Sequence, residues 1–267
     1  MNRKEKRAHK KELDVLEEIV MIIKQYFPKL IDSFNEMTDV RNQSYVKYEM
    51  KVIFIVRLMA LICSIKSMNE ISREFNTEEA IKNIGKICGL ELEEIPHHDT
   101  ISDVFENVKI EELEKINKYI VNRLIRSKML DKYRIRGKYF QVIVDGTSLA
   151  VSKTKYNDKC LIKNKKDKDE NEYKEYSIYV LEAKLVVGEM VISIGTEFVE
   201  NKEDIEKLNS QSNEKGKQDC EINAFKRLVK RIKKEYPRLN IVISGDALYA
   251  NGSVIEICKN NNWKYLI

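Results

Sequence analysis

The sequence predicts an α+β protein, with an all-helical N-terminal region followed by a mixed sheet and its flanking helices. Apolar residues recur at helical spacing through the first 130 residues, whereas short continuous apolar runs alternate with helical segments after residue 131. The 267 residues include only 9 Gly and 3 Pro, which argues against an all-β sandwich and against low-complexity linkers. At about 150 residues per domain, we predict two domains, residues 1–130 and 131–267.

The N-terminal region is predicted as a series of helices that could bind DNA or form a dimer. Apolar spacing places them over residues 13–27, 45–67, 68–75, 77–85, from 101 onward and over 110–130. Asp99 or Thr100 is expected to cap the helix that begins near residue 101. The adjacent His97 and His98 suggest a metal site, but neighbours in sequence point in different directions on most backbones. We therefore do not predict metal binding there.

The C-terminal region is predicted as strands and helices in a defined order. A buried strand (139–144) leads to a mobile loop (151–175), and two strands (176–187 and 190–199) are joined by Gly188-Glu189 as a type II′ hairpin. A helix (219–236, capped by Asp219), a strand (241–244), a helix (253–260) and a strand (263–267) follow. This order matches a ribonuclease H-like, five-stranded mixed sheet, in which the first and fourth strands are neighbours.

Two aspartates end the first and fourth strands of this prediction, Asp145 and Asp246. Although 101 residues separate them in sequence, the sheet order would bring their carboxylates together. Attack on a phosphodiester is aided by two divalent ions about 3.5–4 Å apart, held by hard oxygen ligands. Gly146 and Gly245 would let metal and phosphate approach the backbone. Turn chemistry alone explains Asp with Gly at one strand end, but the matched pair favours a site.

Four segments then resemble the DDE transposases of bacterial insertion sequences: VDGT (144–147), KQDCE (217–221), RLVKRIKKEYP (227–237) and SGDALYA (244–250). The resemblance covers roughly residues 96–267, and IPHHDTI (95–101) is similar to the segment that precedes the catalytic domain in many of them. It implies that Asp145 and Asp246 are the first two metal-binding acids of a two-metal site for Mg²⁺, or Mn²⁺. It also implies phosphodiester hydrolysis and strand transfer at transposon ends.

Two further carboxylates are candidates for lining this site, Glu221 and Glu182. Glu182 is alternatively an exposed residue at the sheet edge. The third acid of the family, a glutamate, lies on a helix after the fifth strand, and this sequence stops at Ile267. The apolar ending WKYLI also lacks the usual polar, frayed terminus. We therefore expect a truncated catalytic core, and the alternative function is a catalytically inactive DNA-binding remnant of a transposase.

The charge pattern indicates where DNA could bind. Lys and Arg number 48 against 43 Asp and Glu, a net charge of +5 that permits nucleic-acid binding without requiring it. Two basic segments contain few acids, and their candidate contact residues are Arg134, Arg136, Lys138, Lys226, Arg227, Lys230 and Arg231. Charge runs are more often solvated surfaces, which is the alternative. The resemblance implies double-stranded DNA as partner, both terminal inverted repeats and target, and a homodimer when functional.

Other classes of protein are disfavoured. The most apolar stretch, residues 52–65, is interrupted by Arg57 and is shorter than the ~20 residues that a membrane span needs. With no signal-peptide pattern, a cytoplasmic, nucleoid-associated location without membrane contact is expected. The five cysteines form no CxxC pair, which disfavours thiolate zinc sites and thioredoxin-type redox chemistry. No glycine-rich phosphate-binding motif supports a doubly wound α/β module for a small ligand.

Overall fold

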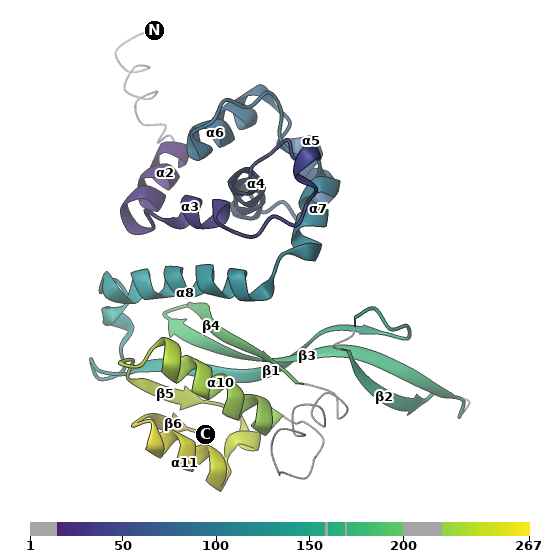
Figure 1. Cartoon of the computed structure of the whole chain (residues 1–267). Coiled ribbons are helices and arrows are strands. Elements are labelled where there is room, and N and C mark those ends of the chain that lie inside the picture. Colours follow the sequence, from purple (N-terminus) through teal and green to yellow (C-terminus); the bar gives the residue numbers. More distant parts are fainter. Residues whose placement is uncertain (1–14, 158–159, 169, 200–220) are drawn as a thin grey trace, which may run out of the picture. The chain divides into compact units, whose positions relative to one another are not determined.

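The structure is a computed structural model that describes residues 15–157, 160–168, 170–199 and 221–267 (Figure 1). The chain divides into two compact units, Met1–Ser127 and Lys128–Ile267. Each unit has its own core and is described by itself.

The first unit is helical and is built around α4 (Met50–Ile62). Its other helices are α2 (Val15–Tyr26), α3 (Leu30–Asn35), η1 (Gln43–Tyr45), α5 (Met68–Glu74), α6 (Glu78–Cys88), α7 (His98–Asn107) and α8 (Ile110–Arg126). On α4, Ile53, Ile55 and Val56 are fully buried, so this helix is apolar nearly all round, as the sequence predicts for the centre of a bundle. None of the helices in the described residues is both long and apolar enough to span a membrane.

Side-chain caps set the start of two helices in this unit, one at the predicted residue and one not. Ser67 and Glu70 form a capping box that starts α5, at the predicted position. The prediction for α7 was wrong by three residues: the helix begins at His98, and its N-cap is His97 rather than Asp99 or Thr100. The His97 ring nitrogen Nδ1 accepts the Asp99 amide, a role that Ser, Thr, Asp or Asn usually fills.

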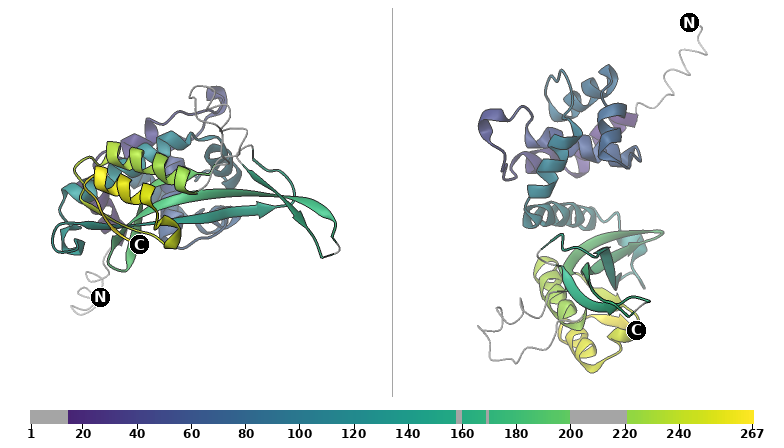
Figure 2. Two further views of the ribbon diagram at one scale, coloured as in Figure 1. Left: turned by 90° about the horizontal axis from the view of Figure 1, so that it is seen from below. Right: turned by 90° about the vertical axis from the view of Figure 1, so that its right-hand side faces the viewer.

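The second unit is a six-stranded mixed sheet with helices α10 and α11 (Figures 1 and 2). Its elements are η2 (Asp131–Tyr133), β1 (Phe140–Ser152), β2 (Leu161–Lys166), β3 (Glu172–Val187), β4 (Met190–Phe198), α10 (Glu221–Glu235), β5 (Ile241–Ser244), η3 (Ala247–Tyr249), α11 (Gly252–Asn260) and β6 (Lys264–Leu266). The strand order is β2-β3-β1-β5-β6, and β4 pairs with β3. Strands β1, β3 and β4 are antiparallel, whereas β5 and β6 run parallel to β1. This confirms the predicted ribonuclease H-like α+β fold.

Two parts of the strand prediction need correction. Strand β1 continues through Asp145 to Ser152, and the predicted loop (151–175) contains β2 and the start of β3. Charged cross-strand pairs such as Lys165–Glu175, 2.8 Å apart, take the place of an apolar alternation, so the sequence pattern concealed this ribbon. The hairpin prediction is confirmed, because Val187 pairs with Met190 and Gly188 has φ +65°. The predicted cap Asp219 lies outside the described residues.

Helix α10 covers one face of the sheet and forms the core of this unit. Its Phe225 and Leu228 are fully buried. Gly195 on β4 makes the close approach possible, because a Cβ there would lie 2.9 Å from Leu228 Cδ1. Val144 on β1 and Ala183 on β3 are register partners, and Ala183 also pairs with Gly195, so these residues share the face toward α10.

Replacing Leu228 with Ala should lower the free energy of unfolding of the second unit by about 2–5 kcal/mol, because it removes buried methyl groups and leaves a cavity. Trp263 is the single tryptophan and is 3% exposed, so its fluorescence during urea unfolding measures this unit. Lys230→Ala on the exposed side of the same helix should change the value by less than about 0.5 kcal/mol. Equal effects of the two changes would contradict the described packing.

Candidate active site

Asp145 lies within β1 and points away from the face that α10 covers. Val142 and Val144 are buried against that face, and because side chains alternate along a strand, Asp145 lies on the opposite face, where it is exposed. The residue is therefore mid-strand, not at a strand end as predicted. Its backbone is fixed by pairing with β3, and its carboxylate is accessible to solvent and to ligands.

Asp246 comes next to Asp145 through the pairing of β1 with β5. The last parallel pair is Ile143 with Ser244, and each aspartate lies two residues beyond its strand's member of that pair. The period of two places Asp246 on the same face as Asp145. Its Oδ1 accepts the Leu248 amide at 2.9 Å, which caps the η3 turn and holds the exposed carboxylate in position. Asp145 thus lies in β1 and Asp246 two residues beyond the end of β5, and the alternation of the strands, continued past Ser244, directs both toward one face.

Glu182 is the cross-strand partner of Asp145 on the other side of β1. At this position β3 also pairs with β4, through Thr196, so Glu182 is not at a sheet edge and that alternative is wrong. Carboxylates directly opposite each other repel, and Lys184 offsets this with an ion pair to Glu182 of 3.0 Å. Three acids therefore follow one another across β3, β1 and the end of β5.

Glu221 lies on the opposite face, at the start of α10, and two tyrosines hold it. Tyr179 donates its hydroxyl to Oε1 at 2.5 Å, and Tyr249 donates to Oε2 at 3.1 Å. Both carboxylate oxygens of Glu221 thus accept a phenol proton. The sequence singled out Glu221 but missed both tyrosines, although Tyr249 lies within the SGDALYA segment.

Burial and the nearby carboxylates raise the pKa values of both phenols. Burial raises the pKa of Tyr179 to about 12, and the hydrogen bond to Glu221 and the charges of Glu221, Asp145 and Asp246 act in the same direction. Burial, followed by the same three carboxylates, raises the pKa of Tyr249 as well. Both phenols therefore remain protonated donors at neutral pH.

Glycine is required beside each aspartate, for a reason that the structure supplies. A Cβ on Gly146 would lie 2.8 Å from Tyr179 Cε1 and 2.9 Å from Glu221 Cδ. A Cβ on Gly245 would lie 2.7 Å from the Tyr249 ring. The sequence suggested that these glycines leave room for metal and phosphate, but the described contacts show that they leave room for the two tyrosines.

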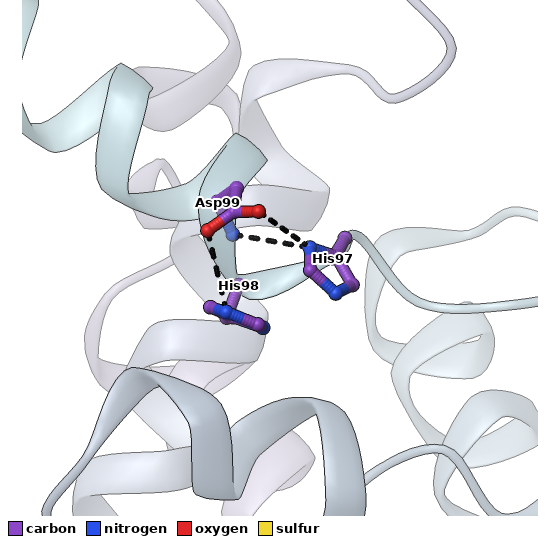
Figure 3. A group of neighbouring side chains, drawn as sticks. All are labelled: His97, His98 and Asp99. Carbon is purple, nitrogen blue, oxygen red and sulfur yellow. Dashed lines mark hydrogen bonds and ion pairs between the residues drawn. The ribbon is translucent and has the colours of Figure 1, made fainter.

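The donor set on the Asp145 face fits a hard divalent cation. Asp145 and Asp246 present exposed carboxylate oxygens, the ligand type that Mg²⁺ and Mn²⁺ prefer. Within the described residues, however, a group of three potential ligands with atoms within 4.8 Å occurs elsewhere, at His97, His98 and Asp99 (Figure 3). Asp145 and Asp246 therefore stay a predicted metal-binding pair, placed close together by the pairing of β1 with β5.

The predicted DNA-contact residues fall into two groups. Three arginines make contacts inside the second unit. Arg134 pairs with Asp131 at 2.7 Å and lies over the Phe140 ring. Arg227 binds Glu197 at 2.9 Å and the Phe198 carbonyl, and Arg231 donates to the Thr196 carbonyl. These contacts join α10 to β4 and fix the start of β1.

The remaining four predicted contact residues are exposed: Arg136, Lys138, Lys226 and Lys230. Lys226 and Lys230 are four residues apart on α10, so they share one helix side. At 1.5 Å per residue they lie about 8 and 14 Å along the axis from Glu221. Arg136 and Lys138 flank a turn that precedes β1, whose first residue, Phe140, lies five residues before Asp145.

Gly146→Ala should destabilise the second unit by about 1–3 kcal/mol, because the added methyl group overlaps Tyr179 and Glu221. Gly252→Ala is the matched control, since a Cβ at this first residue of α11 meets no atom within 4 Å. Urea unfolding followed by Trp263 fluorescence measures both. A Gly146→Ala protein as stable as the control would show that the phenol–carboxylate cluster is not packed as described.

Comparison with known protein families gives one match, in the helical part of the chain. Residues 31–119, about a third of the sequence, match the family described as DDE_Tnp_1-associated. No curated protein sequence matches the chain.

Three solved structures are similar at low level. They are a Mos1 transposase paired-end complex with left transposon end (12% identity, TM-score 0.24), a Mos1 mariner paired end complex with Mn (12%, 0.21) and a pre-cleavage Mos1 transpososome (11%, 0.20). They cover 85%, 92% and 94% of this chain and 62%, 67% and 75% of their own chains, so this chain spans less than two thirds of the first. TM-scores this low do not establish a common fold, so the fold assignment rests on the strand order. The family match is confined to residues 31–119, in the helical part of the chain.

Proposed function

We propose that the second unit carries the active site of a DDE-type DNA transposase, which hydrolyses phosphodiesters and transfers strands at the ends of an insertion sequence. The observation that carries the proposal is the placement of Asp145 and Asp246 on one face of neighbouring parallel strands. Two acids so far apart in sequence are brought together only by this topology. The transposase-associated match over residues 31–119 supports the same assignment.

Asp145 and Asp246 would hold Mg²⁺, with Mn²⁺ as an alternative. When bound, the metal supplies the positive charge that activates a nucleophilic oxygen and stabilises the leaving oxygen. Glu182 adds negative charge to the same face, while its pair with Lys184 limits repulsion in the metal-free protein. Glu221 positions the strand end from the opposite face, through Tyr179 and Tyr249.

Double-stranded DNA is the proposed partner, both as transposon terminal inverted repeats and as target. The exposed Lys226 and Lys230 are proposed phosphate contacts, because they share one side of α10, whose first residue adjoins Gly146 next to Asp145. Arg136 and Lys138 would contact DNA further along its backbone. Assembly as a homodimer and a cytoplasmic, nucleoid-associated location in bacteria complete the proposal.

The second candidate function is a DNA-binding transposase remnant without catalytic activity. One observation favours it: in the described residues, the third acid on the Asp145 face is Glu182, and its carboxylate is already paired with Lys184. A two-carboxylate site holds metal more weakly than a three-carboxylate site. The two candidates differ in strand cleavage and agree in DNA binding.

Under the proposal, the chain should nick supercoiled DNA carrying the element's ends in Mg²⁺ or Mn²⁺, and Asp145→Asn or Asp246→Asn should reduce the rate at least about a hundred-fold. The reason is that each change removes a metal-binding charge while keeping the side-chain volume. DNA binding by gel shift should be unchanged in both variants. Glu256→Gln is the matched control, since it removes one negative charge from an exposed position on α11 that has no part in the proposed site.

The outcomes separate the two candidates. Nicking that survives either Asp→Asn change would overturn the site assignment. A parent chain that binds DNA but does not nick would establish the inactive remnant instead.

The double variant Lys226→Ala/Lys230→Ala should weaken DNA binding on every sequence and reduce the slope of log K against log salt by about 2, because each lysine neutralises one phosphate. Fluorescence anisotropy over a salt series measures the slope. Lys259→Ala/Lys264→Ala removes the same charge from exposed positions elsewhere in the unit and should leave the slope unchanged. Identical slopes for both double variants would assign the effect to net charge alone.

A further inference from the structure

The most compact group of metal-ligating atoms in the described residues lies in the first unit, at the start of α7 (Figure 3). His97 Nδ1 is 3.3 Å from Asp99 Oδ2, and His98 Nε2 is 3.2 Å from Asp99 Oδ1. The two rings are neighbours, with centroids 4.0 Å apart. The expectation that adjacent histidines point in different directions is therefore wrong here, because His97 is an extended N-cap residue and His98 is the first residue of the helix.

We propose that His97, His98 and Asp99 form a binding site for a divalent transition metal of the zinc class, distinct from the carboxylate site of the second unit. Two nitrogens and a carboxylate suit Zn²⁺, Co²⁺ or Ni²⁺, whereas Mg²⁺ prefers oxygen ligands. Ligands about 2.0–2.1 Å from a tetrahedral zinc lie about 3.3–3.4 Å from one another. The observed nitrogen–oxygen separations of 3.2 and 3.3 Å are close to that value.

The hydrogen bonds of His97 show why a cation is favoured. Its Nδ1 accepts the Asp99 amide at 3.4 Å and is therefore unprotonated in this contact; because the nitrogen has one lone pair, a bound metal would replace this long hydrogen bond. The same nitrogen faces Asp99 Oδ2, which also carries only lone pairs when ionised. Two such atoms repel unless a positive charge lies between them. A metal ion supplies that charge, and a proton on the ring is the competing source.

Ser72 on α5 provides the supporting contact that histidine ligands usually have. Its Oγ accepts the His98 amide at 2.9 Å and lies 3.0 Å from His98 Nδ1. With Nδ1–H donating to this hydroxyl, Nε2 presents its lone pair toward Asp99. Ser72 thus orients the ring from a different helix and can accept the Nδ1–H of the tautomer that binds metal through Nε2.

The cavity of about 370 Å³ beside His97 is not itself the proposed site. Its cationic side chains are already paired, Arg41 with Asp39 at 2.6 Å and Lys47 with Glu94 at 2.5 Å. The cavity does leave His97 accessible on that side. Three protein ligands and an accessible cavity leave the remaining coordination position for water or a small ligand.

The test is titration of the untagged, chelator-treated chain with Co²⁺ and Zn²⁺, followed by visible absorption and calorimetry. Because Cys63 is exposed, Cys63→Ser serves as the background protein. One ion should bind per chain, with the absorption of tetrahedral or five-coordinate Co²⁺. His97→Gln and Asp99→Asn, at side chains 59% and 80% exposed, should fold normally and weaken binding at least about ten-fold.

The controls separate this site from the other candidate ligands. His9→Gln removes the third histidine of the sequence, and Asp145→Asn removes an acid of the carboxylate site; neither change should alter Zn²⁺ affinity. Ser72→Ala should weaken binding about ten-fold, a change that tests the orienting contact. Absence of saturable binding, or equal affinity in the parent, His97→Gln and Asp99→Asn proteins, would overturn the proposal and leave the contacts as imidazolium–carboxylate pairs.

Discussion

The parallel pairing of β1 with β5 is the interaction on which the candidate active site depends. Four register pairs, from Phe140–Ile241 to Ile143–Ser244, align two strands that each lead into an aspartate. Strand β5 has only four residues, so its position relies on the burial of Ile241 and Ile243 beneath the helices. The packing of α10 and α11 therefore determines where Asp246 lies, and the hydrophobic core sets the distance between two charged groups.

Because side chains alternate between the two faces of a strand, the acids of the candidate site fall into two groups, one on each face of the sheet. Asp145 and Asp246 lie on the exposed face, where water and a cation can reach them. Glu221 lies on the face toward α10, where two phenols satisfy both of its oxygens. These two hydrogen bonds fix the half-buried Glu221 carboxylate, whose negative charge helps to raise the pKa values of Tyr179 and Tyr249. The exposed face provides ligands, and the covered face holds the backbone between Asp145 and Gly146 in place.

Much of the fold and part of the site could be predicted from the sequence. Continuous apolar runs identify β1, the β3–β4 hairpin and β5 because burial on a sheet face requires them. The run of charges in β2 concealed a strand, since its pairs are stabilised by opposite charges rather than by burial. The tyrosines that hold Glu221 gave no signal, because a contact between residues 42 positions apart depends on tertiary packing.

The histidine pair shows the opposite case. The sequence drew attention to His97 and His98, but the general rule for adjacent side chains led to the wrong expectation. The rule fails at a helix N-terminus, where the backbone changes from extended to helical between the two residues. Local geometry of this kind follows from the cap and cannot be read from residue types alone.

The parallel strand pair has a further consequence, for the relation between folding and ligand affinity. Pairing β1 with β5 closes a loop of about 100 residues, whereas the β3–β4 hairpin closes a loop of two residues. The longer loop costs more conformational entropy to close. If the unit unfolds in part, so that the hairpin stays paired and β5 detaches from β1, Asp145 stays in place but Asp246 no longer lies beside it. A cation held by both aspartates, as proposed, would therefore bind only the completely folded unit and would in turn stabilise that state over every partly folded one.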